Sequence, residues 1–108
     1  MLLDDLIKQA KLTSHNQTFA DTVARDKFYQ SHTWRKKRAE IMKRDNYECQ
    51  VAKSIGEVIQ EKLIIHHIKP LEFFPELALD DSNLIVVSHY YHNIIHELIT
   101  LVESDEWW

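Results

Sequence analysis

The sequence predicts an α+β fold, with helices in the amino-terminal part and a strand, loop, strand and helix in the carboxy-terminal part. Apolar residues recur at three- and four-residue steps over residues 2–12 and 34–42, which is the period of an amphipathic helix. Residues 58–68 and 84–87 are instead rich in Ile and Val, which favours strands. A single glycine, two prolines and the lack of repeats or biased linkers indicate one domain over residues 1–108.

Residues 1–45 are expected to form the helical amino-terminal part. Helical spacing is present over residues 2–12, and residues 21–29 allow a second short helix. Ser31 is a typical N-cap for a third helix, which we expect to end at about Arg44.

The rest of the chain is expected to hold the folded core, over residues 58–102. Before it, residues 47–57 contain a glycine and no helical period, so we expect an irregular loop there. Ser88 is a typical N-cap for the last helix. The predicted order is a strand or hairpin arm at 58–68, a loop at 71–81, a strand at 84–87 and a helix at 89–102.

Charge is distributed unevenly, although the net charge is only −4. All 13 Lys and Arg lie within residues 1–69, whereas residues 70–108 contain Asp and Glu but no Lys or Arg. The sequence ends in an acidic, tryptophan-containing tail at 103–108. Such asymmetry is typical of a basic binding face, or else of ordinary surface solvation. The basic side chains are concentrated in one group: Arg35, Lys36, Lys37, Arg38, Lys43 and Arg44.

Several features favour a cytoplasmic protein without membrane association. Asp4 and Asp5 follow the first residues directly, which is not the pattern of a signal peptide. The longest wholly apolar run, residues 84–87, is far shorter than a membrane span. The single cysteine, Cys49, cannot form an internal disulfide.

Histidines dominate the candidate site residues. His92 and His96 are four residues apart on the predicted helix, so their imidazoles lie one above the other. His66 and His67 are adjacent in a predicted strand and should point to opposite faces. Three imidazoles with positions left open for water and phosphate are typical of a catalytic metal site, whereas a fourth protein ligand closes a structural one. Surface or core histidines without a ligand are the alternative interpretation.

The complete pattern resembles the HNH motif of endonucleases. His66-His67-Ile-Lys-Pro70, then Asn83-Leu84, then His92-Asn-Ile-Ile-His96 match the form His-His … Asn … His-x-x-x-His. The spacing is similar to that in the nuclease domains of DNase colicins and pyocins and in restriction-type HNH enzymes. The upstream segment that begins at Phe28 is similar to the phage and prophage branch, and the resemblance covers about residues 28–96.

This resemblance implies a ββα-metal (His-Me finger) core preceded by helices, in an endonuclease that hydrolyses DNA phosphodiester bonds. It implies that His66, His92 and His96 hold one divalent metal ion. It also implies that His67 is the general base and that Asn83 orients this base by tying down the loop between the strands. Imidazole ligands suit Zn²⁺, Ni²⁺, Co²⁺ or Mn²⁺ better than Mg²⁺. Beside such a motif, the basic group at residues 35–38 and 43–44 is expected to bind DNA phosphates.

Two features depart from the family pattern. Many relatives carry two Cys-x-x-Cys pairs that bind a structural zinc ion, but the corresponding positions here are Cys49, Ala52, Ser88 and Tyr91. We therefore expect no structural zinc and apolar packing in its place. Glu97 also follows the last histidine, where many relatives have Lys.

Two other functions fit the same residues. A metal-stabilised DNA-binding module without catalysis would need His66, His67, His92 and His96 to close one four-ligand site. Adjacent strand histidines argue against this, because both would have to reach one ion. An accessory protein of phage DNA-packaging machinery is the second alternative, with residues 103–108 as a docking tail. For any of these functions, we expect the protein in the cytoplasm of a bacterial cell or of a phage-infected host.

Overall fold

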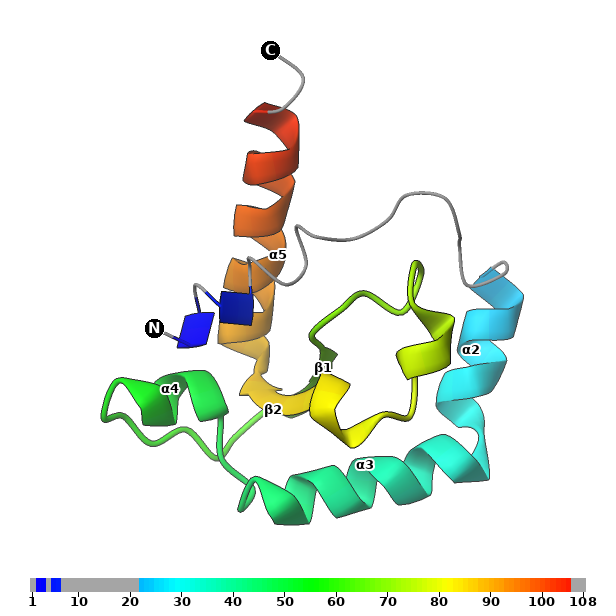
Figure 1. Ribbon diagram of the computed structural model, residues 1–108. Helices are drawn as coiled ribbons and strands as arrows, with labels where there is room; N and C mark the ends of the chain where they lie inside the picture. The colour runs from blue at the N-terminus through cyan, green and yellow to red at the C-terminus, as the bar shows by residue number, and fades with distance from the viewer. Residues whose placement is uncertain (1, 4, 7–21, 106–108) are drawn as a thin grey trace.

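The computed structural model describes residues 2–3, 5–6 and 22–105 (Figure 1). The predicted order of strand, loop, strand and helix in the carboxy-terminal part is confirmed. Residues 2, 3, 5 and 6 are helical as expected, whereas the remainder of the helix predicted over 2–12 lies outside the described residues. The elements are α2 (Thr22–Gln30), α3 (His32–Arg44), α4 (Gln50–Ser54), β1 (Leu63–His67), the 3₁₀ helices η1 (Pro75–Leu77) and η2 (Asp81–Asn83), β2 (Leu84–Ser88) and α5 (His89–Asp105).

β1 and β2 form a two-stranded antiparallel hairpin, in a register that pairs His67 with Leu84. Successive side chains along a strand point to opposite faces. Val86 accordingly packs in the buried cluster that includes residues of α3, and Val87 packs in the cluster that includes residues of α4 and α5. The hairpin therefore lies between α3 on one face and α5 on the other (Figure 1).

The predicted N-cap of α3 is confirmed. The Ser31 hydroxyl accepts a hydrogen bond from the backbone N–H of Trp34 at 3.1 Å, which satisfies a donor that the first helical turn leaves unpaired. The helix ends at Arg44, where Asn46 takes a left-handed φ of 61° that a short polar residue tolerates. The buried face of the helix consists of Trp34, Ile41 and Met42.

Arg44 and Asp45 fasten the end of α3 to β2. The Asp45 carboxylate accepts a hydrogen bond from Arg44 Nε at 2.8 Å and another from the backbone N–H of Val86 at 2.9 Å. The Arg44 guanidinium also donates to the backbone carbonyls of Asp81 and Leu84, at 2.8 and 2.6 Å. This pair therefore satisfies backbone groups at the edge of β2 that faces away from β1.

The prediction of an irregular loop over residues 47–57 is wrong for residues 50–54, which form α4. One turn of helix is too short to show a period in the sequence. It forms because Val51 and Ala52 are both buried in the core cluster to which α5 contributes. Gly56, with a φ of 81°, then follows the helix in a conformation that favours glycine.

The first strand is shorter than the predicted range of 58–68, because only Leu63–His67 pair with β2. Lys62 has a φ of 50°, which interrupts the extended backbone just before the strand. Val58 is 71% exposed, so its β-forming side chain contributes to no buried face. The loop predicted over 71–81 contains η1, and η2 begins at its last residue; each 3₁₀ helix is only three residues long and leaves no period to detect.

The start of α5 is fixed on two sides. The Ser88 hydroxyl accepts a hydrogen bond from the backbone N–H of Tyr91 at 3.2 Å, as expected of an N-cap. The His89 N–H donates to the Lys62 carbonyl at 2.8 Å. The first turn of α5 is therefore tied to the residue that precedes β1.

α5 extends further than the predicted end at residue 102, because it continues to Asp105. The first half of the expected tail over 103–108 is therefore helical, whereas residues 106–108 lie outside the described residues. Within the described part of the chain, no helix is both long and apolar enough to cross a membrane.

We predict that replacing Asp45 by Ala lowers the free energy of unfolding by about 1–3 kcal/mol, because it leaves the buried Val86 N–H without its acceptor. Urea unfolding followed by circular dichroism measures the change. The control is Glu40→Ala, which removes a half-exposed carboxylate that pairs with Lys37, and should change stability by less than about 1 kcal/mol. Equal effects of both substitutions would contradict a structural role for the Arg44–Asp45 pair.

Candidate functional site

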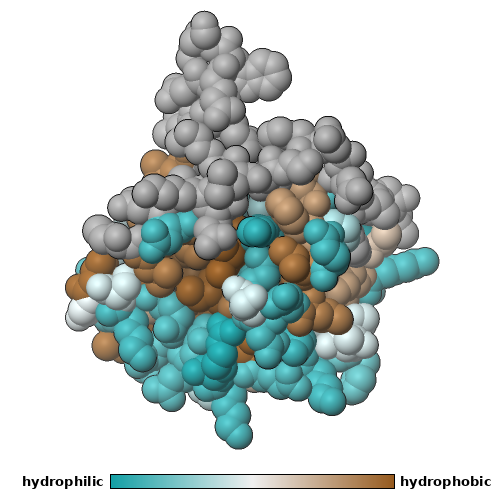
Figure 2. Space-filling view, in the orientation of Figure 1, coloured by the Kyte–Doolittle hydropathy of each residue, from teal (hydrophilic) through white to brown (hydrophobic). Residues whose placement is uncertain are grey.

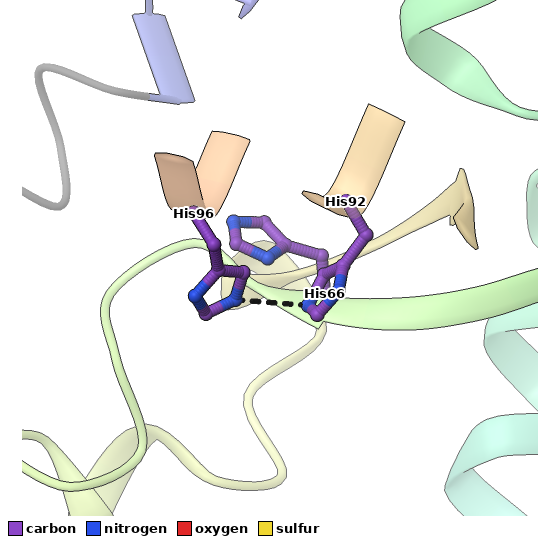
Figure 3. A group of neighbouring side chains, drawn as sticks. All are labelled: His66, His92 and His96. Atoms are coloured by element: carbon purple, nitrogen blue, oxygen red, sulfur yellow. Dashed lines mark hydrogen bonds between the residues drawn. The ribbon is translucent and has the colours of Figure 1, made fainter. Parts of the chain in front are cut away.

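Three histidines meet where the end of β1 approaches the first turns of α5. His66 comes from β1, and His92 and His96 come from one face of α5 (Figure 3). Each offers a ring nitrogen, and these atoms all lie within 4.8 Å of one another. The Nε2 atoms of His92 and His96 are 3.0 Å apart, as the dashed line in Figure 3 marks. The predicted grouping of these three residues is therefore present in the fold.

The electrostatics of His66 and His92 favour neutral imidazoles. Burial, and after it the proximity of His92 and His96, lowers the pKa of His66 to about 3. Burial, and after it His96 and His89, lowers the pKa of His92 to about 4. Neutral imidazole is the form that binds a metal ion.

One unsatisfied atom points to the same conclusion. Among the described residues, His66 Nε2 is the buried side-chain nitrogen or oxygen that has no hydrogen-bond partner. Buried polar groups are nearly always satisfied, so an orphaned nitrogen beside two further imidazoles fits a binding site for a cation. The donor set of three imidazoles suits a divalent transition-metal ion.

His67 lies on the other face of β1, as alternation along the strand predicted, and is not part of the three-histidine group. Its ring stacks on the Trp34 indole, with centroids 5.3 Å apart and planes inclined by 21°. Its Nε2 lies 3.1 Å from the Ala78 carbonyl oxygen, which can only accept. That contact places the ring proton on Nε2 and leaves Nδ1 as the basic nitrogen. Burial lowers the pKa of His67, which also favours the neutral ring.

Asn83 ties down the loop that connects the two strands. Its Oδ1 accepts a hydrogen bond from the Lys69 N–H at 2.8 Å, and its Nδ2 donates to the Lys69 and Leu77 carbonyls at 3.2 and 3.4 Å. Its own backbone carbonyl accepts from the Ile68 N–H at 2.9 Å. Leu77 directly precedes Ala78, so these bonds position the carbonyl that His67 contacts.

His66 and His67 both open onto one pocket of about 310 Å³. His92 and His96 also line it, and Ile65, Ile68, Pro70 and Leu71 make up its apolar part. The remaining lining residues are Arg25, Tyr29 and Glu72. α2 thus contributes two pocket residues that the sequence pattern did not indicate.

The position of α2 explains how those residues reach the pocket. The Phe28 and Tyr29 rings each pack on Trp34, with centroids 5.3 and 5.4 Å away, and Tyr29 also packs edge-on against His67 at 6.2 Å. Phe28 and Tyr29 are adjacent aromatic residues close to Trp34 in the sequence. This pattern could have indicated that the segment packs on Trp34 and so forms one side of the pocket.

The predicted basic group lies on α3 and does not line the pocket. Five of its members are exposed: Arg35, Lys36, Arg38, Lys43 and Arg44. Two are engaged within the protein: Lys37 contacts Asp81 at 2.6 Å, and Arg44 pairs with Asp45. In Figure 2 the lower part of the molecule, where α3 lies in Figure 1, is largely hydrophilic.

The positions that hold zinc-binding cysteines in many relatives are occupied by packing and capping groups. Cys49 and Ala52 are both fully buried in the core cluster, and Tyr91 packs against that cluster. Ser88 caps α5 through its hydroxyl.

A hairpin followed directly by a helix, with histidines converging from strand and helix, is the ββα-metal arrangement of HNH endonucleases. A crystal structure of the HNH endonuclease of the deep-sea thermophilic bacteriophage GVE2, with a manganese ion, is similar to this chain, with a TM-score of 0.62 and 26% sequence identity. The similarity covers 78% of this chain and 85% of that one. No protein-family model and no curated protein sequence matches the chain. The predicted fold class and the resemblance to HNH endonucleases are confirmed.

We predict that the metal-free protein loses stability through His66 as the pH falls. The pKa of His66 is about 3 in the folded protein and near 6.5 in the unfolded chain. The contribution of this difference to the free energy of unfolding is therefore fully present above pH 6.5. Between pH 6.5 and 3 the unfolded chain binds a proton that the folded chain does not, which lowers stability by about 1.4 kcal/mol per pH unit. Urea unfolding in EDTA at several pH values measures this slope.

The His66→Asn variant should show a shallower dependence on pH than the wild-type protein. His32→Asn, at an exposed histidine on α3 outside the three-histidine group, is the matched control and should retain the wild-type slope. Identical slopes for His66→Asn and wild type would contradict the assignment of a buried neutral imidazole.

Proposed function

We propose that this chain is a metal-dependent HNH endonuclease that hydrolyses DNA phosphodiester bonds. The observation that carries the proposal is the convergence of a three-histidine group and His67 on one pocket, within a ββα-metal core. The similar phage structure is described as an HNH endonuclease with a manganese ion, which supports the same class of activity. We propose further that residues 1–108 act as a single nuclease domain.

In this proposal His66, His92 and His96 hold one divalent ion, of Zn²⁺, Ni²⁺, Co²⁺, Mn²⁺ or Mg²⁺. When bound, the ion supplies Lewis acidity toward a phosphate oxygen and the leaving oxygen, and three neutral ligands leave its double charge uncompensated. The three imidazoles approach from two elements whose relative position is fixed by the Ser88 cap and the His89–Lys62 hydrogen bond. The chain therefore presents its ligands already arranged.

His67 is the general base of the proposed reaction. Its Nε2–H donates to the Ala78 carbonyl, so Nδ1 can take a proton from the water whose oxygen attacks phosphorus. As the new P–O bond forms, the bond to the 3′ oxygen breaks. The Ala78 carbonyl holds the imidazolium that results, and stacking on Trp34 keeps the ring in place. Asn83 acts as a positioning residue, because it fixes the loop that carries this carbonyl.

We propose that the exposed basic residues of α3, Arg35, Lys36, Arg38 and Lys43, contact DNA phosphates away from the pocket. Phosphate contacts align the substrate without reading its sequence. Lys37 and Arg44 contribute positive charge to the same helix while they hold α3 against η2 and β2.

We predict that plasmid DNA is cut only in the presence of a divalent ion and that EDTA stops cleavage. His67→Ala should lower the cleavage rate by about 10²–10⁴-fold, because the proton acceptor is lost. The same variant should bind metal as tightly as wild type in calorimetry, whereas His92→Ala should bind it more weakly. Assays with Mg²⁺, Mn²⁺, Ni²⁺ and Zn²⁺ added separately identify the ions that support activity.

The control for this experiment is His89→Ala, an exposed histidine on α5 outside the group, which should cut and bind metal as wild type does. Full activity in EDTA, with the ion shown to be absent, would rule out the mechanism. If His67→Ala loses metal as severely as His92→Ala, a closed four-histidine site in a non-catalytic DNA-binding module becomes the better explanation.

We predict that replacing Arg35 and Arg38 by Ala weakens DNA binding about equally for all sequences. The dependence of log affinity on log salt should flatten by about 0.9 for each phosphate of the duplex that the protein no longer neutralises. Fluorescence anisotropy over a salt series measures both quantities. Lys53→Ala on α4 removes another exposed charge and should leave the slope unchanged. An unchanged slope in the double variant would place the DNA-binding surface elsewhere.

A further inference from the structure

The charge of the pocket comes from two side chains that the mechanism above does not use. Among its described lining residues, Arg25 is the one Lys or Arg and Glu72 is the one Asp or Glu. A phosphodiester that enters the pocket therefore meets one fixed positive charge and one fixed negative charge from the chain itself.

Arg25 and Glu72 face each other across two elements. Arg25 Nη1, on α2, lies 3.5 Å from Glu72 Oε1, on the loop between β1 and β2. Their side chains are 37% and 55% exposed, so water screens the pair and its contribution to stability is small. An exposed ion pair of this kind can exchange one anionic partner for another at little cost.

Arg25 is also held at a defined place relative to His67. It lies one helical turn before Tyr29 on α2, and both side chains line the pocket. Tyr29 packs against His67 and Trp34, which fixes this part of α2 beside the proposed base. The charge of Arg25 acts on the Tyr29 hydroxyl, where it opposes the rise in the pKa of Tyr29 that burial causes.

We propose that Arg25 binds the phosphodiester in the pocket and that Glu72 competes with the phosphate for it. This inference rests on the proposed nuclease function and extends it to a residue outside the HNH motif. A planar guanidinium matches two phosphate oxygens, which favours the exchange of the Glu72 carboxylate for the phosphate group. Glu72, once displaced, still repels the phosphate, so it limits the affinity of the pocket.

The test measures binding of a short labelled DNA duplex by fluorescence anisotropy in EDTA, so that no metal and no cleavage contribute. Arg25→Gln should weaken binding about tenfold or more and flatten the salt slope by about 0.9. Glu72→Gln should tighten binding about two- to fivefold. The gain from Glu72→Gln should be smaller when Arg25 is already Gln, because the competition is gone.

Two matched controls separate this effect from general charge. Lys27→Gln removes a positive charge from the same helix, and Glu76→Gln removes a negative charge from the same loop. Both residues are exposed and neither lines the pocket, so each change should alter binding by less than about twofold. Arg25→Lys should give intermediate affinity, since it retains the charge and loses the planar fork. Unfolding midpoints near that of wild type show that the variants remain folded.

The outcomes distinguish this inference from the proposed nuclease function. If Arg25→Gln and Lys27→Gln weaken binding equally, or if the effects of Arg25→Gln and Glu72→Gln are strictly additive, the inference is wrong even where DNA is cut. If Arg25→Gln alone weakens binding but no divalent ion supports cleavage, the inference stands and the nuclease function fails. Cleavage with unchanged kcat/KM in Arg25→Gln would overturn the role of Arg25 and leave the nuclease function in place.

Discussion

The register of the two-stranded hairpin determines which histidine faces which helix. Because the side-chain period of a strand is two residues, a slip of one residue would turn His66 toward α3 and His67 toward α5. A hairpin of only two strands has little to resist such a slip. The Arg44–Asp45 pair supplies part of that resistance, since it bonds the N–H of Val86 and the carbonyl of Leu84 on the edge of β2. The separation of the proposed base from the candidate metal ligands thus depends in part on an ion pair outside the motif.

Aromatic packing positions α2, which forms one side of the pocket. Trp34 is buried under the hairpin and contacts Phe28, Tyr29 and His67 at once. α2 is therefore attached to the core through the same indole that orients the proposed base. A helix that the HNH motif does not include thereby comes to share the pocket with all four site histidines.

The features that could be predicted correctly from the sequence depend on interactions between residues that are near each other in the chain. The four-residue spacing of His92 and His96, the alternation of His66 and His67, and the caps at Ser31 and Ser88 each depend on neighbours in the chain. The features that were missed depend on distant contacts. α4 is a single turn stabilised by burial, and β1 is shortened by the left-handed backbone at Lys62. Arg25 reaches the pocket through the tertiary position of α2, which no spacing in the sequence encodes.

The apolar packing around Cys49 and Ala52 has a consequence for how such a protein responds to its surroundings. Where relatives fold around zinc held by cysteines, removal of that ion or oxidation of those thiols dismantles the scaffold. Here these positions lie within a core of aliphatic side chains, and the candidate metal group consists of imidazoles, which thiol oxidants do not attack. Scarcity of metal would then stop the proposed reaction while the apolar core around Cys49 and Ala52 remained in place. The scaffold and the candidate metal site would thus respond to separate signals.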